Sequence, residues 1–209
     1  MSIIQELYQE YATLDTGELT SNQKKQLYNQ LEAMRSSDIQ TIDEHKLFLE
    51  LIQKLRQASM DDVELFGKMF RQTLKSLLSV GEDGVYTNQL RFLYELIQNV
   101  DDCDYEDLSD CNLDIQFRYE KEPGRIILTY NETGFKPENV FAITGIAEKA
   151  KNISANKVEI GEKGIGFKSV FGIAKKVFIE SGLFSFELDA NNFTVPIPRY
   201  EGYHPVKGT

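Results

Sequence analysis

Residues 157–171, Lys-Val-Glu-Ile-Gly-Glu-Lys-Gly-Ile-Gly-Phe-Lys-Ser-Val-Phe, place three glycines directly ahead of an apolar run. Glycine accepts positive φ at little cost and lets the backbone approach another molecule closely. The apolar run from Val170 to Ala174 predicts a short amphipathic helix, whose first amides lack intrahelical partners and attract anions. A glycine-rich turn that leads into a helix is therefore suited to binding phosphate. A glycine-rich surface loop without a ligand is the alternative interpretation.

The order of the glycines differs from two common phosphate-binding motifs. Walker A has four residues between its glycines and ends in Gly-Lys-Ser or Gly-Lys-Thr, whereas Lys168 follows Phe167 here. The Rossmann fingerprint reads GxGxxG after a strand, whereas this stretch reads GxxGxG. The stretch instead resembles the second glycine box of the GHKL ATPases, the superfamily of gyrase B, the ninety-kilodalton heat-shock chaperones, histidine kinases and MutL. Its wording is most similar to the sacsin and NO VEIN branch.

That resemblance predicts an N-box, which is an upstream helix with a Glu and an Asn four residues apart. Residues 86–103 have apolar residues at helical spacing: Leu90, Leu93, Leu96, Ile97 and Val100. Glu95, Asn99 and Asp102 follow at i, i+4 and i+7, so they share one stripe of this helix. Alone, such a stripe is typical of the solvent face of any helix. Combined with the glycine box, it resembles the N-box pattern Glu-Leu-Ile-x-Asn.

The resemblance implies a role for each of these residues. Glu95 would be the catalytic base or orient the attacking water, Asn99 would bind Mg²⁺, and Asp102 would contact the nucleoside. The other implied contacts frame the ATP lid and the phosphates: Gly134, Gly161, Gly164, Gly166, Phe167, Lys168, Ser169 and Thr209. The mobile lid is expected in residues 145–156, and the lysines in and beside it either meet phosphate or face solvent.

The first glycine box departs from the superfamily pattern. Most members carry Asp-x-Gly-x-Gly, in which the Asp accepts a hydrogen bond from the adenine amino group. Here the stretch is Tyr130-Asn-Glu-Thr-Gly-Phe135, with no aspartate and only Gly134. Asn131 can accept the same bond through its amide oxygen, but it can also donate, so the choice of base stays open. An ordinary turn from strand to helix is the alternative interpretation.

The N-terminal region predicts helices without chemistry of their own. Residues 1–80 contain no proline and repeat apolar residues at helical spacing, with breaks near 15–17, 36–38 and 59–62, which indicates three or four helices. His45 lacks the Arg and Pro that usually follow a phosphoacceptor histidine. A solvent-facing histidine on a helix is therefore expected, and the histidine kinase class is disfavoured.

The remaining elements are expected to be strands joined by short turns. A β-hairpin is predicted from 113–119 and 125–130, and a short helix begins near Pro137. A strand, a tight turn and a strand are predicted over 176–189. Residues 193–198 predict a further or edge strand, because prolines cannot donate to a ladder.

The composition is that of a soluble globular protein, with 209 residues, 41% hydrophobic and 27% charged. The net charge of −10 argues against direct nucleic-acid binding, which needs a basic face. No membrane partner is expected, because no apolar run reaches the length of a membrane span and the start of the chain lacks the pattern of a signal peptide. Cys103 and Cys111 have no partner at zinc-ligand spacing, and the acidic stretch 104–114 lacks a calcium-loop pattern. A reducing cytoplasm is the expected location.

Together these features predict an α+β fold, a two-layer α/β sandwich of the Bergerat type in residues 83–209, with a helical extension in 1–82. The resemblance implies Mg²⁺-dependent ATP binding and slow hydrolysis, which drive lid closure or homodimerisation in a larger chaperone-like or defence-related protein. Gly208-Thr209 resembles a superfamily motif that more sheet follows, so further domains or a partner are expected beyond Thr209. The alternative is a non-catalytic scaffold or nucleotide sensor, which the altered first box favours and the intact Glu95 and Asn99 oppose.

Overall fold

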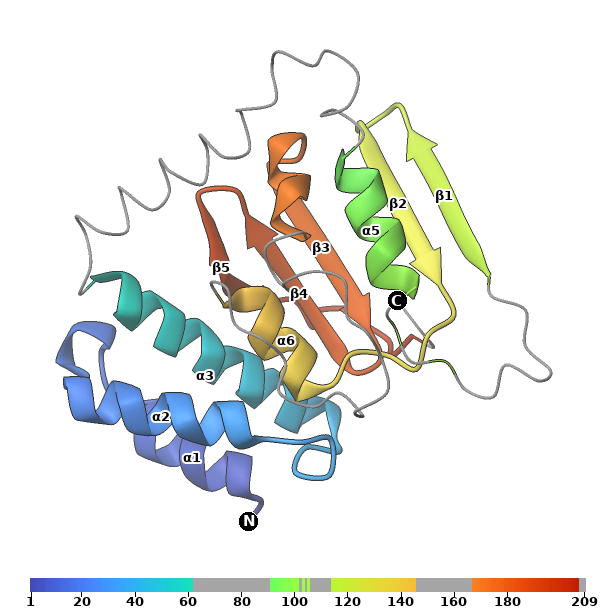
Figure 1. Ribbon diagram of the computed structural model, residues 1–209. Coiled ribbons are helices and arrows are strands. Elements are labelled where there is room, and N and C mark those ends of the chain that lie inside the picture. Colours follow the sequence, from blue (N-terminus) through green and yellow to red (C-terminus); the bar gives the residue numbers. More distant parts are fainter. Residues whose placement is uncertain (62–90, 102, 104, 106–113, 146–166, 207–209) are drawn as a thin grey trace.

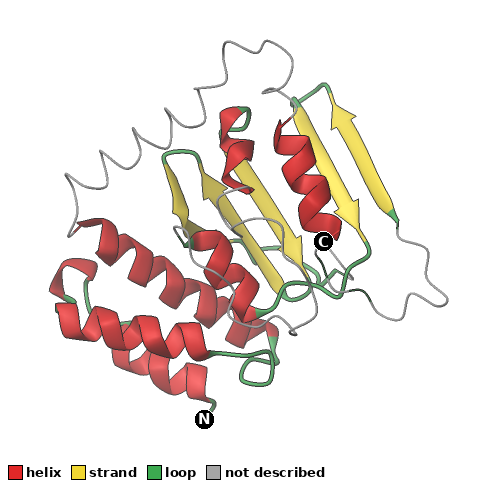
Figure 2. Ribbon diagram, viewed as in Figure 1, coloured by secondary structure: helices red, strands yellow, loops and turns green. Residues whose placement is uncertain are grey.

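The computed structural model describes residues 1–61, 91–101, 103, 105, 114–145 and 167–206. These residues form a mixed α+β fold in which the helices lie on one side of small antiparallel sheets (Figures 1 and 2). Several predicted features lie outside the described residues: a fourth N-terminal helix near 66–78, the lid beyond Gly145, Asp102, Gly161, Gly164, Gly166 and Thr209.

Helices fill the described N-terminal region: α1 Ile3–Tyr11, η1 Thr16–Glu18, α2 Ser21–Ala33 and α3 Ile42–Asp61. The predicted breaks near 15–17 and 36–38 are confirmed, whereas α3 continues through residues 59–61 and residue 62 lies outside the described residues. Polar contacts explain two of the helix ends. Thr20 accepts a hydrogen bond from the Gln23 N–H at 3.3 Å, and the Gln23 side chain accepts one from the Thr20 N–H at 3.0 Å, so α2 begins with a capping box. Lys54 of α3 donates to the carbonyls of Tyr11 at 2.7 Å and Ala12 at 2.8 Å, which satisfies the open end of α1.

The described strands form two antiparallel sheets, which confirms the predicted hairpin, strand-turn-strand unit and edge strand. The strands are β1 Ile115–Glu120, β2 Arg125–Tyr130, β3 Lys176–Ser181, β4 Phe184–Asp189 and β5 Asn192–Pro198. β1 pairs with β2, while β3, β4 and β5 pair in that order. Among the described residues β5 is an edge strand, a position that tolerates its two prolines. The central strand β4 is buried along nearly all of its length.

The main core lies between the three-stranded sheet and helices α3 and α6, the latter comprising Pro137–Thr144. Phe48 of α3 is fully buried, and its ring centroid lies 6.0 Å from that of Phe184 in β4. Arg56 of α3 donates to the Phe141 carbonyl of α6 at 3.1 Å and lies 4.7 Å from the centroid of the Phe141 ring. Tyr28 of α2 meets the same ring edge-on at 5.1 Å. The N-terminal helices and the sheet therefore share one hydrophobic core.

The prediction of a solvent-facing His45 was wrong. The side chain is only 6% exposed and packs edge-on against Phe184, with 4.5 Å between ring centroids. Its Nδ1 lies 2.7 Å from the Thr41 carbonyl oxygen, one turn back in the chain. Burial lowers the pKa of this imidazole below its ordinary value, because the charged form loses its hydration. His45 is therefore a core residue at the contact between α3 and the sheet.

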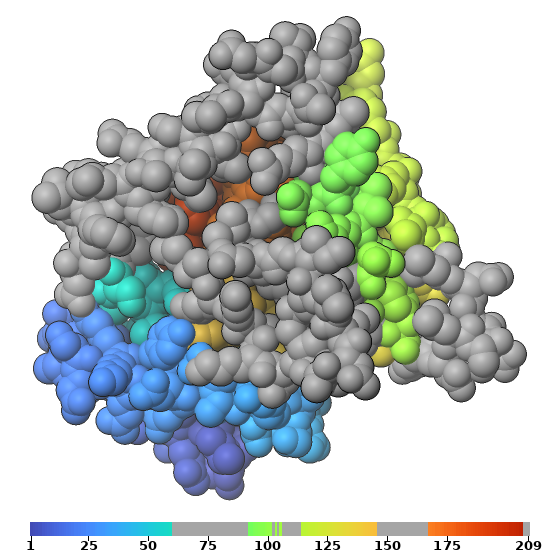
Figure 3. All heavy atoms as spheres, in the orientation of Figure 1, coloured from blue at the N-terminus to red at the C-terminus, as the bar shows by residue number. Residues whose placement is uncertain are grey.

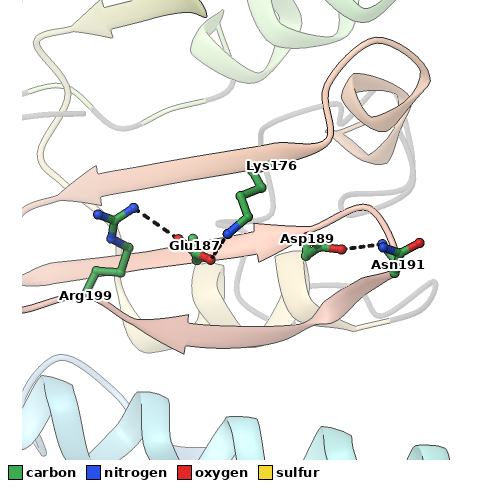
Figure 4. A network of polar contacts seen from close by, with 5 residues as sticks. All are labelled: Lys176, Glu187, Asp189, Asn191 and Arg199. Atoms are coloured by element: carbon green, nitrogen blue, oxygen red, sulfur yellow. Dashed lines mark hydrogen bonds and ion pairs between the residues drawn. The ribbon is translucent and has the colours of Figure 1, made fainter. Parts of the chain in front are cut away.

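The opposite face of the sheet carries a buried carboxylate, Glu187 of β4, which is 9% exposed (Figure 4). It accepts from Lys176 Nζ at 2.8 Å and from Arg199 Nη1 at 3.1 Å. The Arg199 guanidinium also lies 4.6 Å from the ring centroid of Phe178. A central strand accommodates an acidic residue here because two half-exposed cations neutralise it.

Candidate functional site

Glu95 and Asn99 lie on α5, Arg91–Asp101, one helical turn apart. Phe92 and Val100 are the most buried side chains of this helix, at 8% and 1% exposed. Glu95 and Asn99 are half-buried and flank that buried stripe, while the solvent side of α5 is formed by other residues: Tyr94, Ile97 and Asp101. Glu95 and Asn99 therefore do not lie on the solvent face of the helix, which was the alternative interpretation of this polar stripe.

The predicted apolar face of α5 is only partly correct. Ile97, expected to be inside, is 46% exposed, whereas Phe92, not singled out in the sequence, is buried. The C-terminal end of α5 is tied by side chains that follow it: Cys103 Sγ donates to the Asn99 carbonyl at 3.0 Å, and the Tyr105 hydroxyl donates to the Val100 carbonyl at 2.6 Å. Burial raises the pKa of Tyr105 to about 12, so its hydroxyl keeps its proton and remains a donor. These contacts fix the helix end that carries Asn99.

Helix α5 packs against η2, the 3-10 helix Phe167–Gly172 that directly follows the glycine box. In the space-filling view, α5 and the N-terminal helices appear on the same face of the molecule (Figure 3). The element expected after the glycines is therefore present, although it is a short 3-10 helix rather than an amphipathic α-helix. This packing brings the helix of Glu95 and Asn99 beside the helix that begins with Phe167, Lys168 and Ser169.

Lys168 is 2% exposed, and its Nζ donates to the carbonyl of Gly145 at the end of α6. The same ammonium group lies 5.7 Å from the ring centroid of Phe193 in β5. The hydroxyl of Ser169 is buried and has no hydrogen-bond partner among the described residues. Lys168 thus joins η2 to the residue at which the predicted lid begins.

Asn131 and Gly134 lie in the loop that leaves β2. Asn131 is exposed, and its Oδ1 accepts a hydrogen bond from the Asp114 N–H at 2.9 Å, next to the start of β1. Gly134 has a φ of +90° and lies so close to Gly182 that an added Cβ would be 3.2 Å from the Gly182 Cα. The loop is therefore held against the turn between β3 and β4.

Two buried side chains that the sequence did not single out join this loop to β3. Ser181 Oγ accepts a hydrogen bond from the Phe135 N–H at 2.7 Å and donates to Glu132 Oε1 at 3.1 Å. Glu132 stands inside the first glycine box, but its partner is 49 positions away in the chain. No local sequence pattern predicts such a contact, since serine is common at the end of a strand.

The described residues contain no group of three or more His, Cys, Asp or Glu side chains that could hold a metal ion. Asn99 offers a single neutral amide oxygen. That donor set fits Mg²⁺ only when phosphate oxygens and water supply most of its ligands, as is usual for Mg²⁺ at nucleotide sites. Among the helices that the structure describes, none is long and apolar enough to cross a membrane.

Comparisons with known proteins point to the class indicated by the two motifs. No protein-family model matches the chain. It is 29% identical over 155 residues to protein NO VEIN of Arabidopsis thaliana, and the matched residues make up 74% of this chain. It is 31% identical over 135 residues to the chaperone protein HtpG of Rickettsia prowazekii and 30% identical over 135 residues to HtpG of Shewanella sp. strain ANA-3, each covering 54% of this chain.

The chain is distantly homologous to proteins with a GHKL-type ATPase domain, which confirms the resemblance seen in its motifs. The homologues are NO VEIN and HtpG. The chain spans only 5% of the length of NO VEIN and 22% of the length of the Rickettsia HtpG. The match to NO VEIN is longer than the stretch from residue 83 to residue 209. The similarity therefore extends into the N-terminal helical region.

Proposed function

We propose that this chain binds ATP together with Mg²⁺ in a Bergerat-type two-layer sandwich, and that it hydrolyses ATP slowly. The observation that carries the proposal is the half-buried pair Glu95 and Asn99, on a helix that packs against the helix following the glycine box. Distant homology to HtpG and NO VEIN supports the same class of site. In this proposal Asp102, Gly161, Gly164, Gly166 and Thr209 complete the nucleotide contacts.

Each of the two helix residues has a distinct task in this proposal. Asn99 supplies one neutral oxygen ligand to Mg²⁺, whose charge offsets that of the phosphates. Glu95, one turn earlier, orients a water molecule at the γ-phosphate and accepts its proton. Partial burial suits both tasks, because a carboxylate and an amide that are less exposed to bulk water interact more strongly with a nearby charge.

Hydrolysis by this chain is proposed to be weak. Efficient phosphoryl transfer uses a cation that stabilises charge on the transferring group. Lys168 is engaged with the Gly145 carbonyl and is almost fully buried. We propose that the stabilising cation comes from a further domain or from a second copy of the chain after lid closure, within a larger cytoplasmic protein of chaperone-like or defence-related function.

A second candidate function is a nucleotide-sensing scaffold without catalysis. It is favoured by the altered first glycine box, which contains no aspartate and in which Asn131 Oδ1 already accepts a hydrogen bond from the Asp114 N–H. An amide oxygen has two lone pairs, so Asn131 Oδ1 can still accept a second hydrogen bond, such as one from the adenine amino group. The two functions differ in turnover rather than in binding.

The test is calorimetric titration of ATP, with and without Mg²⁺, into the full chain and three variants on α5. We expect micromolar binding that depends on Mg²⁺, loss of the Mg²⁺ dependence in Asn99→Ala, and binding without turnover in Glu95→Gln. Asp101→Asn, which removes a carboxylate from the exposed side of the same helix, serves as the matched control and should bind as the wild type does.

The outcomes separate the candidates. Wild-type binding with turnover abolished by Glu95→Gln supports the ATPase. Binding without measurable turnover in the wild type supports the scaffold. A folded wild type that binds neither ATP nor GTP would contradict both.

A further inference from the structure

We propose that Ser181 is a positioning residue that holds the loop Asn131–Phe135 in place and thereby sets the preference of the site for its nucleotide base. The inference rests on the proposed nucleotide site, since it assigns to that loop the contact with the base. Ser181 itself lies at the end of β3, and we place it outside direct contact with the nucleotide.

The hydroxyl of Ser181 makes a donor and an acceptor bond at the same time. It is fully buried, accepts from the Phe135 N–H at 2.7 Å and donates to Glu132 Oε1 at 3.1 Å. Glu132 is 5% exposed, and a buried carboxylate is stable only where it receives hydrogen bonds. One side chain of β3 thus fixes two points of the loop, on either side of Gly134.

The backbones of the two segments also meet. An added Cβ on Gly134 would lie 3.2 Å from the Gly182 Cα and 3.3 Å from the Gly182 N. This approach is possible because neither residue has a side chain. The hydrogen bonds of Ser181 and the contact between the glycines therefore set the distance between the loop and the β3–β4 turn.

The turn is also held by the segment that follows β5. The Tyr200 hydroxyl donates to the Leu183 carbonyl at 3.0 Å, and the Tyr203 hydroxyl donates to the Gly182 carbonyl at 2.8 Å. The two rings pack edge-on, with 5.8 Å between their centroids. Burial raises the pKa of both phenols, so they stay protonated donors. Ser181 is consequently attached to a fixed part of the fold and can act as an anchor.

Removal of the Ser181 hydroxyl takes one hydrogen bond from the Phe135 N–H and one from the Glu132 carboxylate. A buried polar group that loses a hydrogen bond moves toward water or toward a new partner, because the loss of that bond is costly. The loop would shift, and Asn131, which it carries, would shift with it. Phosphate contacts made by the glycine box and α5 would remain, so the loss falls on discrimination between bases.

The experiment compares Ser181→Ala with Ser185→Ala in the full chain, using the dissociation constants of ATP and of GTP with Mg²⁺. Ser185 is a matched control, because it is also buried in this sheet but donates to the Arg199 carbonyl and not to the loop. We expect Ser181→Ala to weaken ATP binding about tenfold and to bring the ATP to GTP affinity ratio toward one. Ser185→Ala should keep the wild-type ratio. Ser181→Cys, which keeps a weak donor and acceptor at this position, should fall between wild type and Ser181→Ala.

Three results would overturn the inference. The first is an unchanged ATP to GTP ratio in Ser181→Ala and Ser181→Cys, whether or not overall affinity falls, since general loosening weakens both nucleotides alike. The second is an equal change of ratio in Ser185→Ala. The third is a wild type that binds ATP and GTP equally, because the loop then reads no base. A wild type that binds no nucleotide overturns the proposed function itself and is recognised before any variant is made.

Discussion

Replacing Gly134 by alanine tests the close approach between the first glycine box and the β3–β4 turn. Two costs add in this variant. A side chain at a φ of +90° costs about 1–2 kcal/mol. A Cβ that would sit 3.2 Å and 3.3 Å from backbone atoms of Gly182 adds an overpacking cost of about 1–3 kcal/mol, because a backbone cannot rotate away. Alanine also restricts the unfolded chain, which returns about 0.4–1 kcal/mol, so we expect a net loss of about 1–5 kcal/mol.

Two other glycines separate these costs. Gly202 has a φ of +69° but no atom within 4 Å of an added Cβ, so Gly202→Ala carries only the backbone cost, about 1 kcal/mol. Gly17 also has open space around the added Cβ and lacks a positive φ, so Gly17→Ala should be neutral or stabilising by up to about 1 kcal/mol. The three free energies of unfolding should therefore rank in the order Gly17→Ala, Gly202→Ala, Gly134→Ala, from most to least stable.

The assay is urea unfolding followed by far-UV circular dichroism, because the chain contains no tryptophan. The change in midpoint at constant slope gives the change in free energy of unfolding. Equal losses in Gly134→Ala and Gly202→Ala would refute the close approach of the loop to the turn. Equal stability of all three variants would refute the positive φ at Gly134 as well.

Three further predictions follow from contacts in the fold. As the pH falls from 7.5 to 5.5, His45 takes up a proton at its ordinary pKa in the unfolded chain, whereas burial keeps it neutral in the folded protein, so the free energy of unfolding should fall. His45→Gln should flatten this part of the pH profile of the free energy of unfolding. Lys54→Met leaves the last carbonyls of α1 without their donor and should cost about 1–3 kcal/mol in urea unfolding, whereas Lys46→Met, on the exposed side of the same helix, should be nearly neutral. Glu187→Gln should cost about 1 kcal/mol in low salt, since its two partners are half-exposed, and a loss that is the same in 1 M salt would speak against an ionic origin.

The elements with a clear repeat could be predicted from sequence. The hairpin β1–β2 and the strands β3 and β4 follow from alternation and turn residues, and the breaks between the N-terminal helices follow from polar caps. The inner face of α5 could not be predicted in full. Phe92 and Ile97 are both apolar and lie on different sides of the helix, so which one is buried depends on the elements that pack against α5, such as η2.

Contacts between distant parts of the chain were the main source of error. His45 has the polar neighbours of a surface residue, and its burial depends on Phe184, a strand residue far along the chain. Likewise, the motifs indicated Glu95 and Asn99, but the pair Glu132 and Ser181 exists only because β3 passes the end of β2. Sequence patterns predict the secondary structure of each segment by itself, whereas such residue pairs depend on which segments pack against each other.

The position of α3 has a consequence for how the molecule melts and how it can be divided. This helix caps α1 through Lys54, meets α6 through Arg56 and packs Phe48 against the central strand. In the part of the chain that the structure describes, the N-terminal helices and the sheet are therefore joined by extensive contacts. We expect a single cooperative melting transition by calorimetry. A version that begins at residue 83 would lose α3, which covers one side of the core of the sheet. A stable, nucleotide-binding protein of that length would show that α3 is dispensable.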